Sequence, residues 1–109
     1  MELREIQRLV REQRYEVSFH AQQERLEENL DIEQIEEAIV QSGEILEQYP
    51  DDPRGESCLM PGFAGGVAIH VVVGWATRKR DDERVLRLIT VYKPTLPKWL
   101  DARTRGGRA

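Results

Sequence analysis

The stretch FAGGVAIHVVVGWAT, residues 63–77, decides the fold of this chain. It contains two adjacent glycines, Gly65 and Gly66, flanked by apolar residues, which is a strong signal for a β-hairpin turn. Residues 67–77 are the longest strand candidate, and their apolar side chains fall on both alternating faces, which predicts a strand covered on both sides. The fold is therefore expected to centre on an antiparallel hairpin.

Besides residues 67–77, three strands are expected, at residues 44–49 (EILEQY), 57–63 (SCLMPGF) and 84–93 (RVLRLITVYK), and the second of them is the other arm of the hairpin. Pro61 favours a sheet edge or a bulge in the second of them, because proline has no backbone N–H to donate to a neighbouring strand. The charged segment 78–83 is typical of the loop of a second hairpin. Pro94 and Pro97 then end the last strand. In sequence order these segments predict a four-stranded antiparallel sheet.

Helical patterns precede the strands, over residues 3–13, residues 20–29 and a third segment that begins at Ile32. The side-chain oxygen of Ser18 can cap the second helix, and Asn29 suits the left-handed residue that ends it. Asp31, with Gln34 three residues later, forms a capping-box variant that opens the third helix. We therefore expect an α+β fold, in which N-terminal helices pack on one face of a four-stranded antiparallel sheet.

Length and composition limit the class of protein. With 109 residues the chain fits one domain, which we expect over residues 1–100, followed by a disordered basic tail at 101–109. Its one cysteine, Cys58, cannot form a disulfide within the chain, which favours a reducing compartment. No segment has the pattern of a signal peptide or a membrane span, so we expect a cytoplasmic protein without a membrane partner.

The charge is acidic overall but unevenly distributed. A formal net charge of −4 argues against a general nucleic-acid binder. Acidic residues are concentrated between Glu24 and Asp52, whereas basic residues dominate the last part of the chain, at Lys93, Lys98, Arg103, Arg105 and Arg108. A local cationic surface that contacts phosphate is therefore compatible with this sequence.

Several common chemistries lack the residues that they need. The two histidines and Cys58 have no zinc-ligand spacing, and the sequence has neither a glycine-rich nucleotide-binding motif nor a serine-nucleophile motif. We therefore expect no metal and no cofactor. Cys58 is more simply interpreted as a small core residue than as a nucleophile.

The polar and aromatic candidates that remain are His20, Arg25, His70, Tyr92, Lys93 and Trp99. This set suits metal-independent cleavage of RNA, in which the 2′-hydroxyl attacks and the protein supplies a base, an acid and a cation. Histidine titrates near neutral pH, and the planar fork of arginine matches phosphate oxygens. Tyrosine can donate to an oxyanion or stack on a base.

Each candidate also has a simpler structural interpretation. His20 can be a helix-start residue bonded to a nearby carbonyl, and Arg25 can pair with the glutamates of its own helix. A spacing of five residues on a helix separates the His20 and Arg25 side chains by ~140°, so the two do not share a face. His70 can be a buried, hydrogen-bonded histidine of its strand, and Tyr92 and Trp99 can be packing residues.

Five short motifs in a fixed order carry a resemblance to a known family, namely FHAQQERLEENLDIEQIEEAI, GEILEQYP, CLMPGF, IHVVVGW and ITVYKPTLPKW. From about Tyr15 to Leu100 the chain resembles a bacterial domain-of-unknown-function family marked by a His-Ala-x-x-Arg signature. That family is distantly similar to the RelE-like toxins, which share its plan of helices followed by a sheet. The positions that match its motifs are His20, Ala21, Arg25, Gly43, His70, Thr90, Tyr92 and Trp99.

The resemblance implies the toxin component of a type II toxin–antitoxin pair, acting on messenger RNA as a metal-independent endoribonuclease. Its partners would be an antitoxin protein and RNA or the ribosome. Taken together with the chemistry of the side chains, the resemblance assigns two groups of residues. The catalytic residues would be His20, Arg25, His70 and Tyr92, and the substrate-binding residues would be Lys93 and Trp99. His20 would be the general base or acid, His70 the second titrating group and Arg25 the phosphate clamp. A second expectation is a non-catalytic module of the same fold, which binds a partner protein through its sheet edge or acidic helices.

Overall fold

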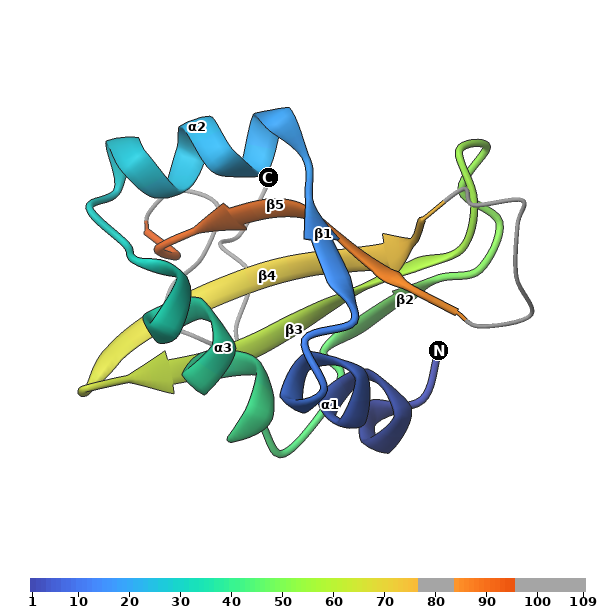
Figure 1. Ribbon diagram of the computed structural model, residues 1–109, viewed down its shortest axis with the longest axis horizontal. Coiled ribbons are helices and arrows are strands. Elements are labelled where there is room, and N and C mark those ends of the chain that lie inside the picture. The colour runs from blue at the N-terminus through green and yellow to red at the C-terminus, as the bar shows by residue number, and fades with distance from the viewer. Residues whose placement is uncertain (77–83, 96–109) are drawn as a thin grey trace, which may run out of the picture.

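A computed structural model describes residues 1–76 and 84–95 of the chain. Within them the chain forms three helices and five strands (Figure 1). These elements are α1 (Leu3–Arg11), β1 (Tyr15–Val17), α2 (Phe19–Glu27), α3 (Ile32–Val40), β2 (Glu47–Tyr49), β3 (Ser57–Ala64), β4 (Val67–Trp75) and β5 (Leu86–Tyr92). The expected loop at 78–83, the tail at 101–109 and the candidate Trp99 lie outside the described residues.

The five strands form one mixed sheet in the order β1-β5-β4-β3-β2. Strands β2 to β5 pair antiparallel, but β1 pairs parallel with β5, with Tyr15 opposite Leu86 and Val17 opposite Leu88. The α+β class is confirmed, whereas the expectation of a four-stranded antiparallel sheet is wrong. Strand β1 escapes prediction because it has three residues and pairs with a segment far along the chain, so no local pattern indicates it.

The glycine turn joins β3 to β4 as predicted. Gly65 and Gly66 have φ angles of 56° and 82°, in the left-handed region that a two-residue hairpin turn of this kind requires. Strand β2 pairs with only the first three residues of β3. Pro61 therefore lies where β3 forms the sheet edge, and its carbonyl accepts a hydrogen bond from Ser42 Oγ (2.6 Å) rather than from a strand.

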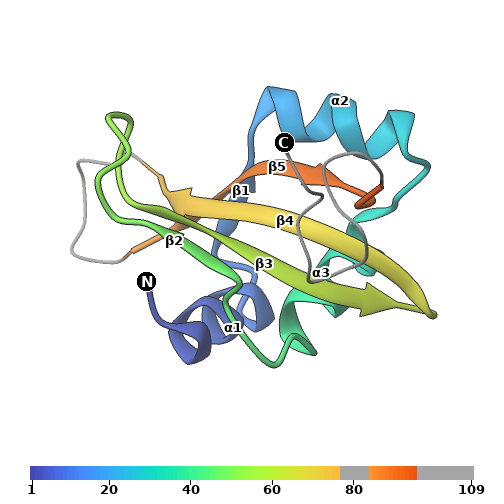
Figure 2. The same cartoon turned by 180° about the vertical axis from the view of Figure 1, so that it is seen from behind.

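Helices α1 and α3 cover one face of the sheet, and none of the three helices lies across the opposite face, which Figure 2 shows from behind. The core between helices and sheet includes Ile6, Leu9, Ile35, Ile39, Met60, Ile69, Val71 and Val73. Helix α3 lies so close to β3 that a Cβ added at Gly62 would be 2.2 Å from the Ala38 carbonyl oxygen. Gly62 therefore permits the close packing of this helix on the sheet.

Side chains satisfy backbone groups at the helix ends. Ser18 Oγ accepts from the Ala21 N–H (2.9 Å), and Asp31 and Gln34 form the predicted capping box. The Nε2 of buried Gln7 donates to three carbonyls at the end of α3 and just after it, those of Ile39, Val40 and Ser42, at 3.2, 3.0 and 2.8 Å. Carbonyls at a helix C-terminus have no partner within the helix. The Gln7 side chain therefore caps the C-terminal end of α3 and connects this helix to α1.

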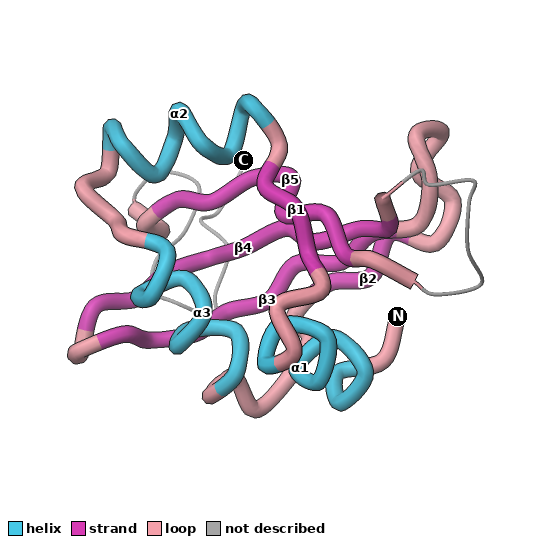
Figure 3. The backbone as a smooth tube through the Cα atoms, in the orientation of Figure 1, coloured by secondary structure: helices cyan, strands magenta, loops and turns pink. Residues whose placement is uncertain are grey.

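The outer edge of β5 is shared by β1 and α2, which follow one another along it (Figure 3). Glu24 Oε1 accepts a hydrogen bond from the Val91 N–H at 2.9 Å. Glu28 Oε1 accepts one from the Lys93 N–H, also at 2.9 Å. The separation of the two glutamates along α2 matches the separation of the two N–H groups along the strand. Four residues of helix rise ~6 Å, and two residues of strand rise ~6.7 Å. Two glutamates one helical turn apart therefore replace the neighbouring strand that β5 lacks here.

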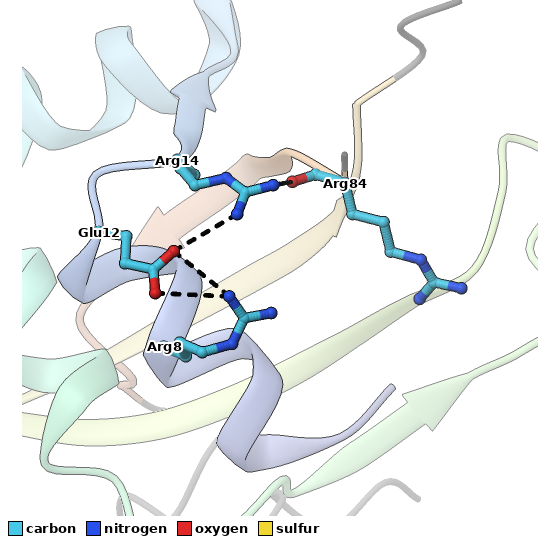
Figure 4. Close-up of polar contacts among 4 residues, drawn as sticks. All are labelled: Arg8, Glu12, Arg14 and Arg84. Carbon is cyan, nitrogen blue, oxygen red and sulfur yellow. Dashed lines mark hydrogen bonds and ion pairs between the residues drawn. The ribbon is translucent and has the colours of Figure 1, made fainter. Parts of the chain in front are cut away.

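An arginine–glutamate cluster joins the end of α1 to the start of β5 (Figure 4). Glu12 accepts from Arg8 and Arg14, at 3.3 and 3.4 Å. Arg14 also donates to the Arg84 carbonyl (3.1 Å), while the Arg84 side chain points away and lies over the Trp75 ring, with 4.6 Å between guanidinium carbon and ring centroid. Exposed ion pairs contribute little stability, so the cluster mainly fixes the path by which the chain enters β1.

Candidate functional site

A cleft of about 740 Å³ opens where α2 begins. Four parts of the chain line it: the start of α2, the loop between β2 and β3, the second half of β4 and the middle of β5. It lies on the sheet face opposite α1 and α3, because Val72 and Gly74 line it while the alternate residues Val71 and Val73 are in the core.

A β-bulge shapes the floor of the cleft. The pairing of β4 with β5 shifts after Val72 and leaves Ile89 as an extra residue of β5. Ile89 and Thr90 consequently both line the cleft, although they are neighbours in the sequence. Gly74 makes room for them, because a Cβ at this position would be 2.8 Å from Ile89 Cδ1.

His20 lies in the first turn of α2, and its side chain is 65% exposed at the cleft. Its Nε2 is 3.2 Å from Glu24 Oε2, one helical turn along. The other oxygen of Glu24 is held by the Val91 N–H, so one carboxylate links the histidine to the edge of β5. When Nε2 carries the proton and donates it to Glu24, Nδ1 keeps a lone pair that can accept another proton. An imidazole oriented in this way by a fixed carboxylate is suited to general acid–base chemistry.

The two acidic residues of the cleft are already hydrogen-bonded. Asp52 Oδ1 accepts from the backbone N–H of Arg54 (2.8 Å) and from its Nε (3.4 Å), and these bonds hold the pKa of Asp52 below its ordinary value. Glu56 accepts from the Met1 ammonium (2.8 Å), and this hydrogen bond lowers the pKa of Glu56 as well. Both carboxylates therefore stay ionised and engaged with their own partners at neutral pH.

The two arginines of the cleft keep donors available. Arg54 uses its Nε for Asp52, and Arg87 uses one terminal nitrogen for Glu16 (3.1 Å). Among residues 1–76 and 84–95, no acceptor is bonded to the two terminal nitrogens of Arg54 or to the second terminal nitrogen of Arg87. These planar groups can bind an anion, and phosphate fits their geometry well.

Arg25, the expected phosphate clamp, is not part of the cleft wall. Its Nε donates to Gln22 Oε1 (2.8 Å) and a terminal nitrogen donates to the Leu30 carbonyl (3.2 Å), so it closes the turn after α2. In the part of the chain that the structure describes, its polar contacts are with these two residues and not with the glutamates of α2. Its position also departs from the His-Ala-x-x-Arg signature, because three residues separate it from Ala21.

His70 and Tyr92 are brought together as cross-strand partners on β4 and β5. His70 Nδ1 is 3.2 Å from the Tyr92 hydroxyl, and the rings meet edge to face with centroids 5.3 Å apart. His70 is 0% exposed, which confirms its interpretation as a buried, hydrogen-bonded histidine. The pair follows Val72 and Thr90 on the same sheet face, so it lies beside the cleft floor. A part for His70 in proton transfer stays a prediction.

Sequence reasoning missed four residues of this site, Phe19, Glu24, Arg54 and Arg87. The four-residue spacing of His20 and Glu24 on a helix was the available signal for their contact. Arg54 comes from the loop before β3 and Arg87 from β5, so their approach to α2 depends on long-range pairing that no motif encodes. Lys93, an expected substrate ligand, follows β5 and is absent from the cleft wall, and its N–H is bonded to Glu28.

No group of three or more histidine, cysteine, aspartate or glutamate side chains in residues 1–76 and 84–95 is arranged to hold a metal ion. Over the same residues, no helix has both the length and the apolar character needed to cross a membrane.

Comparison with known proteins identifies the family. A family model described as a domain of unknown function (DUF4258) matches residues 17–93, from the end of β1 to just after β5. The comparison with curated proteins and the comparison with solved structures each give no match. The matched segment is more than half of the chain and contains every residue that lines the cleft. The chain therefore belongs to the DUF4258 family.

Proposed function

We propose that this chain is the toxin component of a type II toxin–antitoxin pair, and that it cleaves messenger RNA without a metal ion in the cleft at the start of α2. The observation that carries the proposal is the exposed His20 imidazole at the cleft, with Nε2 held 3.2 Å from Glu24 Oε2. An antitoxin protein and the ribosome are the proposed partners, and the cytoplasm is the proposed site of action. The order of α2 and α3 before the antiparallel strands β2 to β5 supports the proposed relationship to RelE-like toxins.

The proposed reaction is attack of the 2′-hydroxyl on the adjacent phosphorus. The 2′-hydroxyl proton passes to His20 Nδ1 as the new P–O bond forms. The bond between phosphorus and the 5′-oxygen breaks, and the 5′-oxygen takes a proton from water or from the protonated His20. The negative charge that develops on the phosphate oxygens is offset by terminal nitrogens of Arg54 and Arg87 that are bonded to no acceptor among the described residues. Arg25 then acts indirectly, by closing the end of α2, whereas His70, the proposed second proton-transfer group, contacts the Tyr92 hydroxyl.

Cleavage of a labelled single-stranded RNA by the purified protein, in the presence of EDTA, tests this proposal. The wild type should produce fragments that end in a 2′,3′-cyclic phosphate, because the 2′-oxygen is the nucleophile. His20→Gln should lower the cleavage rate by roughly 100- to 10,000-fold, the usual contribution of a general acid–base group. Gln23→Ala, an exposed change on the same helix, is the matched control and should cleave at the wild-type rate. Equal cleavage by wild type and His20→Gln, or cleavage only with a divalent metal, would refute the proposal.

The second candidate is a non-catalytic protein-interaction module of the same fold. It is favoured by two exposed apolar residues at the β3–β4 hairpin, Phe63 and Val67. In that case the wild type would cut no RNA, and its induction in a host cell would leave growth unchanged in the absence of its partner.

A further inference from the structure

Phe19 is exposed at the cleft in a way that the fold does not require. It is the first residue of α2, it lines the cleft, and its side chain is 77% exposed. Burial of a phenylalanine side chain normally stabilises a protein, and Phe19, being exposed, contributes little of this stabilisation. His20 is the next residue, and both side chains line the cleft, so an apolar ring and an imidazole lie at the start of one helix.

The polar groups around Phe19 complement an anion with an aromatic part. The two carboxylates of the cleft are engaged, Asp52 by Arg54 and Glu56 by the Met1 ammonium. Among the described residues, Arg54 and Arg87 retain terminal nitrogens that are bonded to no acceptor. The cleft therefore combines a flat apolar surface with planar cationic donors, which is the combination that binds single-stranded nucleic acid.

We propose that Phe19 is a stacking platform for one unpaired base, and that Arg54 and Arg87 contact the phosphate beside that base. The inference rests on the proposed function and narrows its substrate to single-stranded RNA. Stacking on Phe19 requires a base with a free face, and both faces of a base inside a duplex are covered by its neighbours. Single-strand selectivity thus comes from the aromatic residue, whereas the arginines attract any phosphate chain.

Equilibrium binding of a fluorescein-labelled RNA decamer tests the inference. The decamer carries 2′-O-methyl groups, so it cannot be cleaved and the measurement reports binding alone. Phe19→Leu keeps an apolar side chain but removes the ring plane, and Phe19→Trp keeps a ring. Leu26→Ala is the matched control, because Leu26 is 60% exposed on the same helix and outside the cleft wall.

The dissociation constant of Phe19→Leu should rise by roughly 5- to 150-fold, the range that corresponds to loss of one base–aromatic stack. Phe19→Trp and Leu26→Ala should bind like the wild type or, for tryptophan, more tightly. The same decamer annealed to its complement should bind more weakly to the wild type and should respond equally to all three variants.

Equal single-strand affinity of wild type and Phe19→Leu would overturn the inference, as would a wild type that binds no RNA. In that second case the exposed ring would be assigned to contact with a partner protein. Cleavage by the wild type that is insensitive to Phe19 would leave the proposed function standing and refute the stacking role. Ring-dependent binding without any cleavage of an unmodified RNA would support the stacking role and refute the endoribonuclease.

Discussion

Replacement of Glu24 by alanine tests the link between the sheet edge and the candidate site. The Glu24 carboxylate accepts a hydrogen bond from the Val91 N–H at 2.9 Å, and Val91 is fully buried. Glu24→Ala leaves this backbone donor without an acceptor. Loss of a hydrogen bond to a charged group costs about 1.5–3 kcal/mol of unfolding free energy. For a domain of this size, ~2 kcal/mol corresponds to a fall in Tm of roughly 8–16 °C.

Chemical and thermal denaturation of three variants measures the effect. Glu27→Ala is the matched control, because Glu27 is exposed on the same helix and makes no hydrogen bond or ion pair with the described residues. Glu24→Gln retains an oxygen that can accept from Val91, so its stability should stay close to that of the wild type. If Glu24→Ala is no less stable than Glu27→Ala, the glutamate does not replace a strand at this edge and the reasoning fails.

The same variants separate stability from the proposed activity. Glu24→Gln removes the carboxylate that holds His20 Nε2 while keeping the sheet edge intact. Its RNA cleavage should fall by up to the ~100- to 10,000-fold that general acid–base catalysis contributes, without a matching loss of stability. A fully active Glu24→Gln protein would mean that the carboxylate serves the fold alone.

Three further predictions concern packing, pH and salt. Gly62→Ala should lower the unfolding free energy by about 1–3 kcal/mol because its Cβ would meet the Ala38 carbonyl at 2.2 Å, whereas Gly43→Ala, with nothing within 4 Å, should be nearly neutral in urea denaturation. Burial raises the pKa of Cys58 from 9.0 to about 11, so the unfolded chain loses this proton first as the pH rises. The unfolding free energy should therefore fall by on the order of 2–3 kcal/mol from this group between pH 9 and 11, and Cys58→Ala should lack that component in pH-dependent denaturation. Arg54→Gln should reduce the slope of log affinity against log salt concentration for single-stranded RNA by about 0.7, the value of one phosphate contact, and an unchanged slope would exclude that contact.

Local sequence signals predict the elements well, because each depends on residues close together in the chain. Gly65 and Gly66 have the positive φ angles that a tight hairpin needs, and the capping box of Asp31 and Gln34 starts α3. Strand β1 could not be predicted in the same way. It becomes a strand only because β5, far along the chain, offers Leu86 and its neighbours as partners. A three-residue segment is too short to show the alternating pattern of a strand, and neither sequence records which distant segment it pairs with.

The residues of the candidate site show the same difference between local signals and long-range contacts. His20 could be predicted because its residue type and its position at a helix start are both local. The role of Arg25 could not, because the Leu30 carbonyl that it binds is available only after α2 has ended and the chain has turned. The contact of His70 with Tyr92 likewise depends on the pairing of β4 with β5. Arg54 and Arg87 reach the cleft from separate elements, so only the tertiary structure brings them near His20.

The pairing of α2 with β5 has a consequence for solubility. A strand with unpaired N–H groups at a sheet edge can recruit a strand from another molecule, and natural proteins block such edges with charge or with covering elements. Here Glu24 and Glu28 do both, since they occupy the outward N–H groups and place negative charge beside an apolar strand. Displacement of α2 would expose the segment LRLITVY to other copies of the chain. The helix that carries His20 therefore also prevents intermolecular strand pairing at the edge of β5.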